Sequence, residues 1–470
     1  CLAEGPPSML ETATDRVTAI ARARDIAEDD AFRAALADLI AFPTDASHPD
    51  APLQAYLAHV AQGFGAMGFQ TQQLSADGHP FLLASRIEDP DRPTVLGYAH
   101  GDTVPGMEGR WAEGRNPWQL TEDSATGRWY GRGIADNKGQ MLVNMTALQA
   151  VIAERGSLGF NAHVLIEMGE EIGSPGLRKL CAQLKPRLKA DLLIASDGPR
   201  IATDRPTIFL GARGGATFRL RLTRRNGGRH SGNFGGALRN PALELAHALA
   251  SMTTPTGALR VRGWVPEAVP DAARAALAGL TPAGGEVDPD WGAEGLTPAE
   301  RIHAWNSAEI LAFSTGDIAQ PVNAIPASAE AVVQLRYIPG IDDTKLGAAL
   351  RAYLDSHGHP DIEIEEQGPR FRASATPVDH PAARFAAASL EQTSGTPPVV
   401  LPSLGGSLPN DIFTEGLGLP TIWVPHSYPG CSQHAPDEHL PRALFADAAG
   451  LMAGLYWDLG SASKSALAGG

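Results

Sequence analysis

The sequence predicts an α/β fold, in which a mostly parallel sheet covered by helices is interrupted by a smaller α+β domain of ferredoxin-like type. Over residues 1–212, short apolar runs alternate with helix-like segments, which is typical of parallel strands joined by crossover helices. Over 213–372 the strands instead alternate apolar and polar residues, as in a sheet open on one face. The first pattern returns over 373–470. We therefore expect 213–372 to be inserted into the outer domain.

Periodicity places the elements of each domain. In the outer domain, helical spacing covers 30–39, 53–63, 137–155, 381–394 and 441–459, and apolar runs cover 81–87, 94–99, 162–168, 191–196 and 421–424. In the inserted domain, strands are expected at 216–223, 331–337 and 361–366, with helices at 241–251 and 344–357. A Pro-, Ala- and Gly-rich insertion covers 254–307. The small, polar tail 460–470 is expected to be disordered.

Composition excludes several classes of protein. The chain has 470 residues, of which 43% are hydrophobic and 19% charged, as in a protein with a large core. The formal net charge is −15, so neither nucleic acid nor an anionic membrane is expected as a partner. No apolar stretch is long enough to span a bilayer. Three cysteines without a Cys-x-x-Cys pair exclude a thiolate zinc site.

Cys1 is unusual because no Met precedes it. Two interpretations stay open: it is the acylated cysteine of a processed lipoprotein, or it is only where the given sequence starts. We expect a cytoplasmic protein, and a periplasmic or lipid-anchored one under the lipoprotein interpretation.

The most informative motif is His100-Gly101-Asp102, which directly follows the apolar run 94–99. In an α/β sheet the carboxyl ends of the strands face the ligand crevice. His100 and Asp102 are two residues apart, so on an extended segment they point the same way. They are either two ligands of one metal ion or a ligand and the group that orients it. Capping of a turn is the alternative without a function.

Other acids and histidines stand after expected strands or at a helix start: Glu170, Glu171, Asp197, His434 and Asp136. Turn capping, or the N-cap of a helix for Asp136, would explain each one singly. Because they converge on the same edge of one sheet, we expect them to form a site. Oxygen and imidazole ligands without cysteine suit zinc, manganese or cobalt in a hydrolytic site.

Five motifs, in this order, resemble those of the metallopeptidase family that contains carnosinase, carboxypeptidase G, aminoacylase and succinyl-diaminopimelate desuccinylase. They are YAHGDTVP at 98–105, GRGIADNKG at 131–139, GEEIGS at 169–174, SDG at 196–198 and HAPDE at 434–438. The resemblance covers nearly the whole chain, and the insertion looks most like the carnosinase branch. The family usually has Asn in the place of Asp437.

The resemblance implies two Zn²⁺ ions per subunit, with Mn²⁺ or Co²⁺ as alternatives. The implied ligands are His100 and Asp197 for one ion, Glu171 and His434 for the other, and Asp136 as the bridge. The peptide between Asp136 and Asn137 is expected to be cis. Asp102 would fix the tautomer of His100. Glu170 would be the general base for a hydroxide that bridges the metals.

The resemblance also implies that the inserted domain is a lid and dimerisation domain that carries substrate-binding residues. His230 would stabilise the oxyanion, in dimeric members from the neighbouring subunit, so a homodimer is expected; a turn residue is the alternative. Arg336 would bind a substrate carboxylate through its guanidinium fork, and a strand-face charge is the alternative. Asn323, Gly406 and Ser407 are expected to line the site.

Three other patterns are set aside. Residues 63–68 match a dinucleotide fingerprint, but they follow a helix and precede a strand, the reverse of the required order. Ser407 lacks a nucleophile-elbow pattern. Cys431 lies near His434, and packing explains it better than catalysis.

The leading hypothesis is a metal-dependent hydrolase that cleaves the amide bond of dipeptides or short peptides with a free carboxylate. An N-acyl amino acid amidohydrolase with the same metal centre is the runner-up, and the sequence does not decide between them. A non-catalytic metal-binding protein would lack the base, and Glu170 is present.

Overall fold

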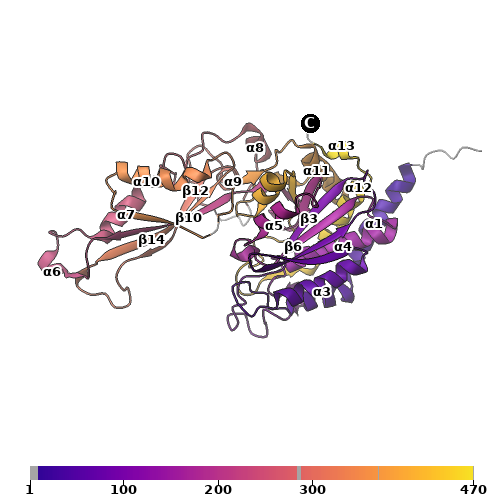
Figure 1. Cartoon of the computed structure of the whole chain (residues 1–470), viewed down its shortest axis with the longest axis horizontal. Helices are drawn as coiled ribbons and strands as arrows, with labels where there is room; N and C mark the ends of the chain where they lie inside the picture. The colour runs from indigo at the N-terminus through magenta and orange to yellow at the C-terminus, as the bar shows by residue number, and fades with distance from the viewer. Residues whose placement is uncertain (1–8, 283–286, 369, 469–470) are drawn as a thin grey trace, which may run out of the picture. The chain divides into compact units, whose positions relative to one another are not determined.

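The computed structural model describes residues 9–282, 287–368 and 370–468. The described chain divides into two compact units (Figure 1). Unit 1 comprises Cys1–Gly211, Ala375–Pro402 and Asp411–Gly470, and unit 2 comprises Ala212–Ser374 and Ser403–Asn410. The lipoprotein interpretation of Cys1 lies outside the described residues. No helix among the described residues combines the length and the apolar character that a membrane crossing requires.

Unit 1 is built on an eight-stranded sheet with the strand order β1-β2-β6-β3-β7-β18-β8-β17. Its strands are β1 (Gln70–Ala76), β2 (His79–Arg86), β3 (Thr94–His100), β6 (Asn161–Glu167), β7 (Leu192–Ala195), β8 (Thr207–Phe209), β17 (Val399–Leu401) and β18 (Thr421–Trp423). The central strands β6, β3, β7 and β18 run parallel, and β1 and β2 add an antiparallel edge. The predicted α/β class with a mostly parallel sheet is confirmed.

Helices cover this sheet and supply its core. They are α1 (Met9–Glu28), α2 (Asp30–Ile40), α3 (Leu53–Ala66), α4 (Lys138–Arg155), α5 (Leu177–Leu184), α11 (Pro381–Ser394), α12 (Arg442–Leu459) and α13 (Lys464–Leu467). The helix α4 packs on β3 and is covered in turn by α1 and α12. This explains why α4 and α12 bury residues on nearly every side. The expected disorder of the tail is wrong for α13, because Leu467 is buried in this core.

Short strands and turns lie in the loops between the main strands of unit 1. A three-stranded sheet has the order β19-β5-β4, from β4 (Thr121–Asp123), β5 (Arg128–Tyr130) and β19 (His439–Pro441). Single turns are formed by η1 (Glu170–Ile172) and η3 (Ile412–Leu417). The pairing of β5 with β19 places the loop after residue 130 beside the loop before residue 439.

Unit 2 has an antiparallel sheet with the order β12-β14-β10-β15. Its main elements are β10 (Gly214–Thr223), β12 (Ser307–Ser314), β14 (Ser328–Tyr337), β15 (Glu363–Gln367), α7 (Pro241–Ser251) and α10 (Leu346–Ser356). Burial alternates along β10 and β14, as the sequence pattern predicts. The buried face packs with residues of α7 and α10 around Trp264.

The remaining elements of unit 2 are short. They are β11 (Arg229–His230), α6 (Ser231–Phe234), α8 (Asp271–Ala276), α9 (Pro298–His303), β13 (Ala324–Ile325) and η2 (Asp343–Lys345), with β9 (Gly211–Ala212) and β16 (Ser374–Ala375) where the chain passes between the units. The expected insertion 254–307 holds α8 and α9.

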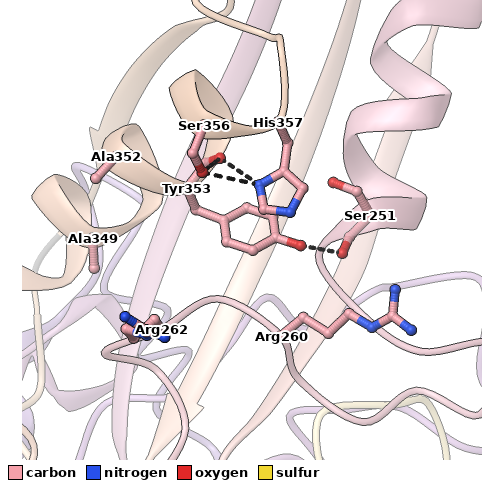
Figure 2. A pocket seen from close by; sticks show the side chains of 8 residues that line it. All are labelled: Ser251, Arg260, Arg262, Ala349, Ala352, Tyr353, Ser356 and His357. Atoms are coloured by element: carbon pink, nitrogen blue, oxygen red, sulfur yellow. Dashed lines mark hydrogen bonds between the residues drawn. The ribbon is translucent and has the colours of Figure 1, made fainter.

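A pocket of about 640 Å³ lies in unit 2 beside α10 (Figure 2). Ala349, Ala352 and Tyr353 of α10 line it, together with Arg260 and Arg262 of the loop after α7. The figure shows the Tyr353 hydroxyl directed at Ser251, to whose carbonyl oxygen it donates a hydrogen bond. None of the lining residues is a predicted site residue, so this pocket is not the predicted site.

Candidate metal centre

Neighbouring parallel strands bring candidate ligands to one edge of the sheet in unit 1. The central strand β3 pairs with β6 on one side and with β7 on the other. His100 is the last residue of β3, η1 follows β6, and Asp197 follows β7. The strand ends therefore gather these side chains, as the sequence predicts.

Two groups of three side chains have the spacing of metal ligands. The first comprises His100, Asp136 and Asp197, and the second comprises Asp136, Glu171 and His434. Within each group the candidate ligand atoms all lie within 4.8 Å of one another. The five residues predicted as ligands are thus brought together, and Asp136 belongs to both groups.

Asp136 contacts the two groups through different oxygen atoms. Its Oδ1 lies 3.0 Å from His100 Nε2, and its Oδ2 lies 2.9 Å from His434 Nε2. Each histidine also faces a second carboxylate, at 3.5 Å for His100 Nε2 to Asp197 Oδ2 and 3.2 Å for His434 Nε2 to Glu171 Oε2. The carboxylate of Asp136 therefore lies between the two groups, with one oxygen facing each.

The loop that carries Asp136 is held on both sides. The peptide between Asp136 and Asn137 is cis, as expected. The side-chain amide of Asn137 donates to the carbonyl oxygen of Ser196 at 2.7 Å, next to Asp197. Gln433, which precedes His434, donates its Nε2 to Asp136 Oδ2 at 2.5 Å. Gln433 could not be predicted from the sequence, because a lone amide beside a histidine carries no ligand pattern.

Asp102 contacts both His100 and the turn that carries the two glutamates. His100 Nδ1 lies 3.2 Å from the backbone carbonyl oxygen of Asp102 and 3.5 Å from its carboxylate. The same carboxylate accepts hydrogen bonds from the backbone N–H of Glu170 at 3.2 Å and of Glu171 at 3.0 Å. Asp102 is fully buried. Its carboxylate therefore holds η1 as well as facing the histidine that it is expected to orient.

Burial and mutual repulsion change the acidity of the cluster. Burial raises the pKa of Glu170 well above its usual range, and the charges of Glu171 and Asp197 raise it further. Burial and the charge of Asp136 raise the pKa of Glu171 to about 7. Hydrogen bonds to Asp136 and Glu171 raise the pKa of His434 to about 11. In the absence of a cation, the cluster therefore retains protons that a cation would displace.

The donor set fits divalent cations. Among the described residues, no lysine or arginine lies within ion-pair distance of Asp136, Glu171 or Asp197. Glu171 Oε1 is buried and has no hydrogen-bond partner in the described part of the chain. Buried carboxylates need compensating positive charge, which the protonated His434 supplies without metal and which a divalent cation would supply in its place. Imidazole nitrogens and carboxylate oxygens are ligands that zinc accepts.

Comparison with known proteins identifies the family of this chain. The family model described as peptidase family M20/M25/M40 matches residues 96–458, which include both ligand groups. The chain belongs to this family. The resemblance inferred from the five motifs is therefore confirmed.

Two named proteins are similar to this chain in sequence. Over 194 residues the chain is 36% identical to "Beta-Ala-His dipeptidase" of Homo sapiens, covering 41% of this chain and 38% of the human protein, so the match spans less than half of that relative. Over 357 residues it is 28% identical to "Cysteinylglycine-S-conjugate dipeptidase" of Corynebacterium striatum, covering 72% and 74%.

A solved structure shares the fold. It is the M20 family metallo-carboxypeptidase Sso-CP2 of Sulfolobus solfataricus, with a TM-score of 0.78 and 22% identity, covering 92% of this chain and all of that one. The architecture that the sequence predicts is thus the M20 fold.

The predicted substrate-binding residues of this M20 chain lie in unit 2. His230 is exposed, and its Nδ1 accepts a hydrogen bond from the Gly232 N–H at 3.1 Å. Asn323 is also exposed, and its carbonyl oxygen accepts from the Ser231 N–H. Because β11 pairs with β13 in the register His230↔Ala324, the structure places Asn323 beside His230.

Arg336 and Ser407 also come together in unit 2. Arg336 Nη1 donates to Ser407 Oγ at 2.6 Å. Gly215 lies opposite Arg336 on β10, and a Cβ there would stand 3.3 Å from Ser407 Oγ, so the glycine leaves room for both side chains. Gly406 precedes Ser407 in the same loop. Sequence reasoning missed Gly215, because one glycine at the start of an alternating strand gives no signal of what it faces.

Proposed function

We propose that this chain is a di-zinc dipeptidase that hydrolyses the amide bond of dipeptides or short peptides with a free carboxylate. The observation that carries the proposal is the position of Asp136, which joins two ligand groups through its two oxygens. His100 and Asp197 would hold one zinc ion, and Glu171 and His434 the other. We propose zinc because each group combines an imidazole with carboxylates, which are ligands that zinc accepts. Manganese and cobalt are the alternatives, since they accept the same ligands.

Glu170 is the proposed general base. It lies beside the ligand groups, directly before Glu171, but it is a member of neither group. Its raised pKa suits a carboxylate that must take up a proton and release it again. When bound, two metal ions would make a water molecule acidic and polarise the scissile carbonyl. Glu170 would receive the proton of that water and deliver it to the leaving amine.

Arg336 is the proposed ligand of the substrate carboxylate. Burial lowers the pKa of its guanidinium, and no described carboxylate lies within ion-pair distance of it. The nearly buried Arg213 lies close enough that Arg336 lowers its pKa further. Among the described residues, neither guanidinium has a carboxylate within ion-pair distance, although Glu309 lies near enough to Arg213 to raise its pKa. This arrangement favours an anionic ligand at Arg336. Gly406 and Ser407 would line this subsite.

His230 is the proposed oxyanion donor, and we propose that it acts in a homodimer. Every residue of the segment 229–239 around it is exposed in the single chain, as is Asn323. Unit 2 also exposes apolar residues on its edge strand β12, namely Ile310, Leu311 and Phe313. A groove of about 420 Å³ runs between Leu249 of α7 and this strand. An exposed apolar edge strand is a surface that a second copy can cover.

Dipeptides are the proposed substrates because the two sequence relatives are named as dipeptidases. The alternative of an N-acyl amino acid amidohydrolase is not favoured by these relatives. Dipeptides and N-acyl amino acids differ on the acyl side of the scissile bond, where a dipeptide carries a free amino group.

A substrate panel tests the proposal. Metal-free protein is assayed with a set of dipeptides and with the matching N-acetyl amino acids, before and after Zn²⁺ or Mn²⁺ is added. We expect turnover of dipeptides that appears with metal and disappears with a chelator. Preferential turnover of the N-acetyl compounds would replace the proposed substrate class, and absence of turnover for every compound would remove the proposal.

A further inference from the structure

Glu438 is a buried carboxylate that no part of the proposed mechanism uses. Its side chain is 1% exposed, as is that of its ion-pair partner Arg132, whose Nη1 lies 2.7 Å from Glu438 Oε2. Among the described residues, Arg132 Nε and Nη2 have no hydrogen-bond partner. Glu438 is therefore the carboxylate that, in the described part of the chain, lies within ion-pair distance of Arg132.

Three backbone N–H groups complete the environment of this carboxylate. Gly133 N–H donates to Oε2 at 3.1 Å, while Ala135 N–H and Asp136 N–H donate to Oε1 at 2.8 and 3.2 Å. With Arg132, each oxygen of Glu438 thus accepts two hydrogen bonds. One of these four donors is the backbone of the bridging ligand Asp136 itself.

The carboxylate lies where two ligand-bearing loops meet. The strands β5 and β19 pair with Tyr130 opposite His439, and the Gly131 N–H donates to the backbone carbonyl oxygen of Glu438 at 3.1 Å. One loop leads from this point to Asp136, and the other leads back four residues to His434. Glu438 fixes the first loop by its side chain and belongs to the second.

Contacts of Asp437, the residue before Glu438, hold the same end of the His434 loop. Asp437 has a positive φ of 61°, a conformation that Asn and Asp tolerate better than most residues. Its Oδ1 accepts a hydrogen bond from the Ala112 N–H at 3.1 Å and lies 3.1 Å from Arg115 Nη1. The loop is thus anchored next to Glu438, so a shift of the carboxylate would move Asp136 relative to His434.

We propose that Glu438 is a positioning residue that couples the two metal positions, because it sets where the bridging Asp136 stands relative to His434. The inference rests on the proposed metal centre. Replacing Glu438 by glutamine tests this role. Glutamine has the same size as glutamate, but its NH2 group would face two of the four hydrogen-bond donors and could not accept from them. Outer groups that orient ligands typically affect metal affinity by about 10- to 100-fold when they are changed.

The experiment compares Glu438→Gln with wild-type protein and with Glu300→Gln. Glu300 is a matched control, because it is also buried, pairs with an arginine and accepts a backbone N–H, but it lies in unit 2. Zinc affinity is measured on metal-free protein by competition with a chromophoric chelator. Thermal unfolding is followed with and without zinc, and kcat is followed as a function of zinc concentration.

We expect Glu438→Gln to bind zinc about 10- to 100-fold more weakly, to gain less thermal stability from zinc, and to need more zinc for turnover. Glu300→Gln should bind zinc as the wild type does. Wild-type zinc affinity in Glu438→Gln would overturn the inference, whatever its stability without metal. Should this variant fail to fold, Glu438→Asp, which withdraws the carboxylate by one methylene, is read in the same way. A wild-type protein that binds no zinc would refute the proposed function instead.

Discussion

Replacing Asp102 by alanine separates the ligands of the metal centre from the residues that hold them. The carboxylate of Asp102 lies 3.5 Å from His100 Nδ1 and accepts the backbone N–H groups of Glu170 and Glu171. Truncation leaves these two N–H groups without their acceptor. His100 keeps the backbone carbonyl oxygen of residue 102 at 3.2 Å, so its tautomer retains one partner.

The magnitude follows from these contacts. A buried donor that loses its acceptor costs about 1–3 kcal/mol, so the two N–H groups together cost about 2–6 kcal/mol of the free energy of unfolding. Removing a buried negative charge beside other carboxylates offsets part of this cost, since the charge of Asp102 also raises the pKa of Glu167. We therefore expect a net loss near the lower end, about 2–3 kcal/mol, measured by urea unfolding without metal.

The catalytic effect distinguishes Asp102 from a ligand. We expect kcat of Asp102→Ala to fall by about 10- to 100-fold, because η1 no longer holds Glu170 in place. The metal content, measured by mass spectrometry of the dialysed protein, should stay near that of the wild type. His100→Ala should instead lose metal from one position. Equal metal loss in the two variants, or an unchanged kcat in Asp102→Ala, would refute the reasoning.

Three further predictions concern the base, the titration of the ligands and the substrate carboxylate. Glu170→Gln should lower kcat by about 10²- to 10⁴-fold with unchanged metal content, and retained turnover would remove Glu170 as the base. The pKa values of His434 (about 11) and Glu171 (about 7) are raised, so zinc must displace protons from both side chains at pH 7. Calorimetry in buffers of different ionisation enthalpy should therefore show proton release, and zinc affinity should fall as the pH falls through 7. Zinc binding that is independent of pH would contradict this prediction. Arg336→Ala should raise KM for dipeptides by about 10- to 100-fold, since a charge-assisted hydrogen bond contributes about 1.5–3 kcal/mol, and should leave KM for C-terminally amidated dipeptides unchanged. An equal rise in KM for both kinds of substrate would contradict the binding of the substrate carboxylate by Arg336.

The sequence predicted the strand-end residues because their position follows from local patterns. An apolar run such as 94–99 predicts a buried strand, and parallel strands end at one edge, so His100 and Asp197 could be placed near each other without coordinates. The resemblance carried by the motifs added the bridging role of Asp136 and the cis peptide that follows it. The class of the fold followed from the same alternation of strands and helices.

Contacts made by the backbone could not be predicted in this way. The hydrogen bonds from the N–H groups of Glu170 and Glu171 to Asp102 depend on how η1 turns after its strand. The four hydrogen bonds to Glu438 depend on two loops that are about 300 residues apart in sequence. No periodicity or spacing in one sequence reports such contacts. The helix α13 was missed for a similar reason, because a short polar segment folds here by burying one leucine, Leu467.

Titration of metal-free protein with zinc shows whether Asp136 joins two metal positions and whether turnover needs both. Dipeptide hydrolysis and bound zinc are measured at each step up to an excess of metal. Turnover should reach its maximum when two zinc ions are bound per chain. Full turnover with one bound ion, or turnover that is independent of zinc and resistant to chelators, would contradict this expectation.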